Sequence, residues 1–195
     1  LMPVDVPELE WDNLQIIFAT SDGDVRQNDL SDFTNVQRNG KIAMKLEPGD
    51  GIIGVATCTD ADDFLLTTRG GKAIRFPVGD VRVFKGRDST GVRGIKLADG
   101  QEVISLVVVG EGLILTASEF GYGKLTPLED FPVHGRGGQG VIALQTTERN
   151  GRTVAALQVS TDHELMLISS NGTLVRTAVA QISIVGRNTQ GVRLI

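Results

Sequence analysis

Residues 64–77 read FLLTTRGGKAIRFP, and this stretch decides the fold. A short apolar run ends at a Gly-Gly turn, and a second apolar run follows it. The pattern predicts a β-hairpin, because short runs rich in apolar and β-branched residues are typical of strands and glycine permits a tight turn. A related stretch occurs three more times along the chain. The chain is therefore built from repeats.

The four copies align on a turn glycine and on a second glycine that opens a further predicted strand. The turn glycines lie 48, 50 and 51 residues apart, and the second glycines lie 51, 49 and 51 residues apart. The turn glycines are Gly23, Gly71, Gly121 and Gly172, and the second glycines are Gly40, Gly91, Gly140 and Gly191. No segment has a long helical period. Four short strands in about 50 residues is the size of a propeller blade, so we predict an all-β, propeller-like fold.

The repeats also set the expected boundaries. In the second unit we predict four strands of one blade, and they are Phe64–Thr68, Ala73–Pro77, Gly91–Leu97 and Val103–Val109. Residues 16–195 form one repeat domain, with blades at about 16–63, 64–112 and 113–164 and an incomplete blade at 165–195. Residues 1–15 are expected to be the end of an upstream blade plus an acidic linker. The reason is that residues 1–4 resemble residues 52–55, which we predict to form the last, closing strand of a repeat. We therefore expect a piece of a longer array, part of a larger ring.

Charge is unevenly distributed along the chain. The total is −5, but residues 1–63 hold 13 acidic and 4 basic side chains, whereas residues 64–100 hold 3 acidic and 8 basic ones. Residues 101–195 are nearly balanced, with 8 acidic and 7 basic side chains. A phosphate backbone responds to a local basic stripe, so the negative total weakens a nucleic-acid hypothesis without excluding it.

Basic residues recur near equivalent positions of the repeats. One follows each turn glycine by three or four residues, namely Arg26, Arg75, Lys124 and Arg176. Repetition along blades would line such cations up on one edge, and the scarcity of aromatic residues favours duplex DNA over single strands. The predicted DNA contacts are Arg69, Lys72, Arg75, Arg82, Lys85, Arg87, Arg93, Lys96, Lys41, Lys45, Lys124, Arg136, Arg176, Arg187 and Arg193.

Other motifs carry no chemistry. Residues 135–140 match the dinucleotide motif G-x-G-x-x-G, but the following Val141–Leu144 is predicted to be a strand, where that motif requires a helix. The two histidines have no ligand partners at a metal-binding spacing, and 60–63 lack the glycine and the final glutamate of a calcium loop. The chain has one cysteine, Cys58, which cannot form an intrachain disulfide, and its apolar runs are too short to span a bilayer. We expect no catalytic residue, metal, cofactor or membrane association in this segment, and a cytoplasmic location.

Several strings identify a family resemblance. Arg75–Pro77, Gly91–Ile95, Gly123–Leu128 and above all Gly186–Arg193 resemble the repeats in the C-terminal domain of the bacterial DNA gyrase A subunit, and the likeness runs from residue 14 onward. The resemblance implies a β-pinwheel, in which neighbouring four-stranded blades exchange a strand. It further implies that duplex DNA of any sequence wraps around a basic outer rim and so supports negative supercoiling.

The resemblance also implies the wider setting. The parent enzyme would be an ATP-dependent type II topoisomerase, an isomerase of DNA topology, in which this segment assembles with the B subunit, and with the rest of the A subunit, in a heterotetramer. The cleavage tyrosine, ATP and magnesium would lie elsewhere in that enzyme, which is cytoplasmic and associated with the nucleoid. The family's hallmark box, Q-R-R-G-G-K-G, belongs to the first blade and is expected upstream; here only Gly135–Gly140 is related to it.

Two other functions remain open at this point. The corresponding subunit of topoisomerase IV shares the fold, with fewer and more degenerate blades. A protein-binding propeller of the WD40 or kelch type would better explain the negative net charge. An enzyme with its active site in a propeller channel is a weaker hypothesis, because no paired acidic residues recur on the blades.

Overall fold

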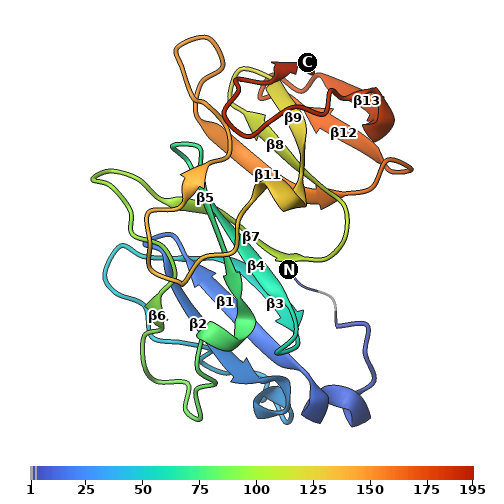
Figure 1. Cartoon of the computed structure of the whole chain (residues 1–195). Coiled ribbons are helices and arrows are strands. Elements are labelled where there is room, and N and C mark those ends of the chain that lie inside the picture. The colour runs from blue at the N-terminus through green and yellow to red at the C-terminus, as the bar shows by residue number, and fades with distance from the viewer. Residues whose placement is uncertain (1, 3) are drawn as a thin grey trace.

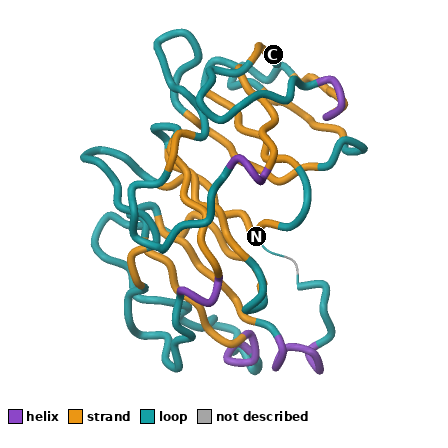
Figure 2. Tube along the Cα trace, viewed as in Figure 1, coloured by secondary structure: helices purple, strands orange, loops and turns teal. Residues whose placement is uncertain are grey.

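The computed structural model describes residues 2 and 4–195 and shows a curved row of small β-sheets (Figures 1 and 2). The strands are β1 Gln15–Thr20, β2 Asp24–Asp29, β3 Ile52–Cys58, β4 Asp63–Thr68, β5 Lys72–Pro77, β6 Val92–Arg93, β7 Val103–Val109, β8 Leu113–Ser118, β9 Tyr122–Pro127, β10 Val141–Ile142, β11 Thr153–Val159, β12 Glu164–Ile168, β13 Leu174–Ala178 and β14 Val192–Arg193. Short 3-10 helices occur at η1 Glu8–Asn13, η2 Leu30–Phe33, η3 Val78–Asp80, η4 Leu128–Asp130 and η5 Val179–Gln181. The all-β prediction is confirmed.

The sheets are blades that share strands. Their strand orders are β3-β1-β2-β6, β10-β5-β4-β7 and β11-β8-β9-β14, and β12 and β13 form a two-stranded pair. The outer strand of each four-stranded sheet comes from the next repeat along the chain. β6 therefore pairs with β2 of the preceding blade, not with β5, through Asp24↔Arg93 and Val25↔Val92. This corrects the assignment of Gly91–Leu97 to the same blade as β4 and β5, and it is the strand exchange that the family resemblance implies.

Each blade is organised around the hairpin that the repeat predicts. In the second blade Leu66 of β4 faces Ile74 of β5 on one side and Leu106 of β7 on the other. The turn requires glycine: Gly23 of the first hairpin has φ 88°, and a Cβ there would lie 2.9 Å from the Ile95 carbonyl oxygen. Only glycine adopts this left-handed conformation at little cost.

The cores continue from one blade to the next. One cluster joins Ile17 and Val25 of the first sheet to Phe64 and Phe76 of the second. The two phenyl rings meet edge to face, with centroids 4.8 Å apart. The strands β3, β7 and β11 pack side by side, so they form the inner edges of consecutive sheets and the exchanged strands form the opposite, outer edges.

The first repeat departs from the predicted pattern. Residues 40–42 form no strand, and residues 34–51 contain no regular element. The equivalent segments β6, β10 and β14 each pair with the blade before them, and the residues described ahead of β1 include no hairpin that 40–42 could join.

The region before β1 is described in part. The closing strand predicted at 1–4 includes residues 1 and 3, which lie outside the described residues. Met2 packs on the core cluster around Phe18 and Met44. Most of the acidic linker forms η1, where Trp11 Nε1 donates to the Val6 carbonyl at 3.0 Å. In the described part of the chain no helix is long and apolar enough to cross a membrane.

Candidate nucleic-acid interface

Each exchanged strand is preceded by a loop of the form G-R-x-x-x-G. These loops, called here the Gly-Arg loops, are 86–91, 135–140 and 186–191. Just before each of them, a single parallel bridge ties the chain to the second strand of the preceding blade, and the three bridges are Gln27↔Val83, Arg75↔Val133 and Leu125↔Ile184. The loops therefore lie along the outer edges of successive sheets. We call these edges, with their loops, the outer rim.

The last glycine of each loop allows this close approach. Gly191 has φ 76°, and a Cβ there would lie 2.6 Å from the Gly123 carbonyl oxygen. The fourth loop residue is held as well, because its carbonyl accepts a backbone N–H from the preceding repeat. These bonds are Lys45 to Ser89 at 3.2 Å, Lys96 to Gly138 at 2.8 Å and Gln145 to Thr189 at 2.9 Å.

The arginine of each loop lies at the junction of two repeats. Arg136 donates from Nε to the Asp80 carbonyl at 2.9 Å and from Nη1 to the Arg93 carbonyl at 3.2 Å. Arg187 donates from Nη1 to the Ile142 carbonyl, in the equivalent exchanged strand, at 2.8 Å. The half-buried Arg87 has a buried Nη1 without a partner among the described residues. Carbonyls orient Arg136 and Arg187 but leave their positive charges uncompensated, so these side chains can still attract an anion.

Further cations of the predicted set are exposed around these loops. Arg82 stacks on the Phe84 ring at 4.2 Å, and Lys85 follows that ring in the chain. Lys96 and Lys72 line a cavity of about 330 Å³ between neighbouring blades, together with Gln101 and Gln139. Two cations of the first repeat are also exposed. They are Lys45 and Lys41, whose Nζ donates to the Asp32 and Thr34 carbonyls at 2.9 and 3.0 Å.

Four predicted contacts are neutralised by acidic partners. The ion pairs are Arg69–Glu102, Arg75–Asp63 at 2.9 Å, Arg93–Asp24 at 3.0 Å and Arg176–Glu164. Arg75 is also mostly buried and donates to two carbonyls of the next repeat. A paired charge attracts a phosphate less than a free one does, so these four are weaker candidates.

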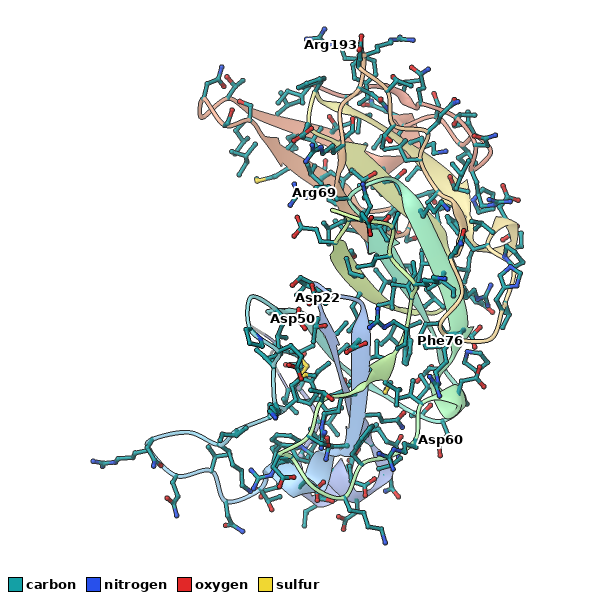
Figure 3. The ribbon with its side chains drawn as sticks, turned by 90° about the vertical axis from the view of Figure 1, so that its left-hand side faces the viewer. Asp22, Asp50, Asp60, Arg69, Phe76 and Arg193 are labelled. Carbon is teal, nitrogen blue, oxygen red and sulfur yellow. The ribbon has the colours of Figure 1, made fainter. Side chains whose placement is uncertain are left out.

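Arg69 also lies at a different edge of the molecule. Figure 3 shows it on the same side as Asp22 and Asp50, whereas Asp60 lies on the other side. Asp50 accepts hydrogen bonds from the Ser21 hydroxyl at 2.7 Å and the Asp22 N–H at 3.0 Å, which lowers the pKa of its carboxyl in spite of its burial. The edge of the molecule that carries Arg69, at the turn between β4 and β5, is therefore partly acidic.

The base that follows each turn glycine occupies two different positions. Arg26 and Lys124 lie three residues after the glycine and face Phe18 and Thr116 across their hairpins. The bases four residues after it, at 75 and 176, are shifted by one position along the strand. Side chains alternate between the faces of a strand, so this offset places the two pairs on opposite faces.

Lys124 and Arg26 are fully buried. Lys124 is therefore not among the DNA contacts that the exposed cations suggest, because its ammonium group is enclosed by the protein. Burial and, to a smaller extent, the neighbouring charge of Arg187 lower the pKa of Lys124 to about 8. Burial also lowers the pKa of Arg26. The one-residue offset from the glycine was the signal that could have separated these cations in the sequence.

The remaining candidates for chemistry stay structural. Gly140 leads into the strand β10, as expected, and not into the helix of a dinucleotide site. Asp62 of the acidic cluster caps its own turn by accepting from the Thr59 N–H at 2.7 Å. Cys58 is buried, and burial raises the pKa of its thiol to about 12. Among residues 2 and 4–195, no group of three or more His, Cys, Asp or Glu side chains is arranged to hold a metal ion.

Blades that exchange their outer strand define the chain as a propeller-like repeat domain with a loop-bearing rim. A family model described as the DNA gyrase C-terminal domain, β-propeller, matches residues 15–59, 62–110, 112–160 and 163–195. The chain belongs to this DNA gyrase C-terminal domain family.

Individual relatives agree with this assignment. The chain is 51% identical over 181 residues to the DNA gyrase A subunit of Pseudomonas aeruginosa, and the match covers 92% of the chain and 20% of that protein. It is 46% identical over 191 residues to the DNA gyrase A subunit of Escherichia coli K12, and this match covers 97% of the chain and 22% of that protein. The chain thus spans about a fifth of the length of these relatives.

Two solved structures show the same fold. A DNA gyrase A C-terminal domain superimposes with a TM-score of 0.85 at 26% identity, over 94% of this chain and 62% of that one. The C-terminal domain of a DNA topoisomerase IV superimposes with a TM-score of 0.90 at 21% identity, over 100% of this chain and 60% of that one. The second likeness shows the fold alone, so the gyrase assignment comes from the sequence.

Proposed function

We propose that the outer rim binds duplex DNA without reading its sequence. The observation that carries the proposal is the recurrence of one Gly-Arg loop on each of three successive blades, with the arginines at 136 and 187 held against the preceding repeat by backbone carbonyls. The proposed contacts are Arg82, Lys85, Arg87, Lys96, Lys72, Lys41, Lys45, Arg136 and Arg187.

The chemistry of these groups supports backbone contacts. Guanidinium groups match phosphate oxygens in geometry and charge. Contacts to the phosphate backbone of DNA position a protein on the duplex without carrying sequence information. The described rim offers Phe84 beneath arginines but no row of exposed rings on which bases could stack, so a duplex suits it better than a single strand. The acidic residues that set the net charge to −5 gather in residues 1–63, away from most of these cations in the sequence.

We further propose that the curved rim wraps DNA and supports negative supercoiling in a gyrase. In this view the chain is non-catalytic, and strand cleavage, ATP and magnesium belong to other parts of the enzyme. Its partners would be the B subunit, together with the rest of the A subunit, in the bacterial cytoplasm. The support is the identity to two named gyrase A subunits of about five times this length.

The test is a fluorescence anisotropy titration with several duplexes of unrelated sequence. We expect similar affinities for all of them, and affinities that fall steeply as salt rises, because each phosphate contact releases counterions. Absent or salt-independent binding would contradict the proposal and favour a protein-binding propeller. Large differences between the duplexes would indicate base readout instead.

A further inference from the structure

Arg26 on β2 and Lys124 on β9 are fully buried cations, so neither can contact a DNA phosphate itself. They occupy the same position of their repeats, three residues after a turn glycine. A buried charge is costly unless it is well hydrogen-bonded, so the partners of these two residues show what they do.

Arg26 holds the Gly-Arg loop of the next repeat. Its Nη1 donates to the carbonyl and the hydroxyl of Ser89, both at 2.7 Å, and its Nη2 donates to the Gly86 carbonyl. Its Nε donates to Asn28 Oδ1 at 2.9 Å, and its guanidinium lies over the Phe84 ring at 4.4 Å. These contacts fix the loop on both sides of Arg87.

Lys124 holds the corresponding loop two blades further along. Its Nζ donates to the Gly186 carbonyl at 2.8 Å, to the Arg187 carbonyl and to Thr189 Oγ1 at 3.0 Å. Three acceptors match the three N–H donors of an ammonium group. One of the acceptors is the backbone of Arg187 itself, so Lys124 fixes the residue whose side chain lies at the rim.

The middle blade provides an internal comparison. Ile74 occupies the equivalent position there and is buried. Its Cδ1 lies 3.6 Å from where a Cβ of Gly138 would be, and the loop is tied through Gly137 N–H to the Gly94 carbonyl at 2.6 Å. The loop that carries Arg136 is therefore held by apolar packing and backbone bonds, without a buried cation.

We propose that Arg26 and Lys124 are positioning residues, which clasp the Gly-Arg loops of the next repeat and thereby aim Arg87 and Arg187 at the DNA backbone. The DNA half of this inference rests on the proposed function, whereas the clasp itself does not. The rim is thus built by two kinds of cation: buried ones that hold the loops and outer ones that meet phosphate.

The clasp is tested by limited trypsin digestion of the whole chain at about pH 7.5, read by mass spectrometry. Trypsin cleaves after arginine, so cleavage after Arg87, Arg136 and Arg187 reports the opening of each loop. Lys124→Met should accelerate cleavage after Arg187 by about tenfold, because it removes charge-assisted bonds to that loop, and Lys124→Arg should not. Cleavage after Arg136 should stay unchanged. Unchanged cleavage after Arg187, or equal acceleration at all three sites, would overturn the clasp.

The link to DNA is tested by a double-mutant cycle in the anisotropy assay. Lys124→Met and Arg187→Ala should weaken duplex binding by similar factors, and the double variant should bind no more weakly than Arg187→Ala alone. Arg152→Met, which removes an exposed cation beside the inner strand β11, is the matched charge control and should change little. Additive losses would overturn the positioning role. If the unaltered chain does not bind duplex at all, the proposed function and the DNA half of this inference fail, and the trypsin result still decides whether the clasp exists.

Discussion

The three loop arginines offer the strongest quantitative prediction. Replacing Arg87, Arg136 and Arg187 together by glutamine removes three proposed phosphate contacts while keeping an N–H donor at each position. Each contact contributes about 0.9 to the slope of log affinity against log salt, so the slope should fall by about 2.7. Between about 50 and 200 mM salt the unaltered chain should then lose about 40-fold more affinity than the variant does.

The assay is anisotropy with one labelled duplex across that salt range. The matched control replaces the same three residues by lysine, which keeps the charges, and its slope should stay close to that of the unaltered chain. Thermal unfolding of both variants shows whether the blades remain intact. A glutamine variant that folds normally and keeps the full slope would refute the assignment of phosphate contacts to these loops.

Three further predictions follow from the internal contacts. Arg75→Met should leave the slope of log affinity against log salt nearly unchanged. It should lower the free energy of unfolding by about 1–3 kcal/mol, measured by urea denaturation, because it leaves Asp63 without its partner. A large loss of the salt slope would contradict this prediction. Gly23→Ala should cost about 1–3 kcal/mol in the same assay because φ is positive and the Ile95 carbonyl is close, and an unchanged midpoint would contradict it. Burial keeps the pKa of Lys124 at about 8, against 10.5 ordinarily. Between these two pH values the unfolded chain binds a proton that the folded chain lacks, so the folded chain becomes more stable as the pH rises. The free energy of unfolding, measured relative to that of Lys124→Met, should therefore rise from about pH 7.5 to about pH 9.5. A relative stability that falls over this range would show that burial does not set that pKa.

Much of the fold could be predicted because the repeat marks its own turns. Gly71 and its equivalents fix each hairpin, and the strands at 64–68 and 73–77 differ from β4 and β5 by one residue at one end. The exchanged strand could not be assigned from the residues alone. It is two residues long, and its partner β2 lies more than 60 residues earlier in the chain, so local patterning carries no information about the pairing. The family resemblance supplied that feature.

The site was predicted less well, since its members differ in what they contact and not in residue type. Lys124 and Lys85 are both lysines in the repeat region, yet one is enclosed by three acceptors and the other is exposed. The offset of one residue between Arg26 and Arg75 was visible in the sequence, and alternation along a strand makes it decisive. The partners of the buried cations lie about 60 residues further on, in the next repeat, and only the folded arrangement brings them together.

The central claim is that the outer rim, and not the inner edge, meets duplex DNA, and site-specific photocrosslinking tests it most directly. A photoactivatable group would be attached to a cysteine placed by Asn188→Cys in a Gly-Arg loop, or by Leu157→Cys on the inner strand β11 at the opposite edge of the same sheet; both positions are exposed, and the native Cys58 is buried. We predict that the probe at 188 crosslinks to duplex DNA in a salt-sensitive manner and that the probe at 157 does not. Efficient crosslinking from 157, with none from 188, would contradict the claim.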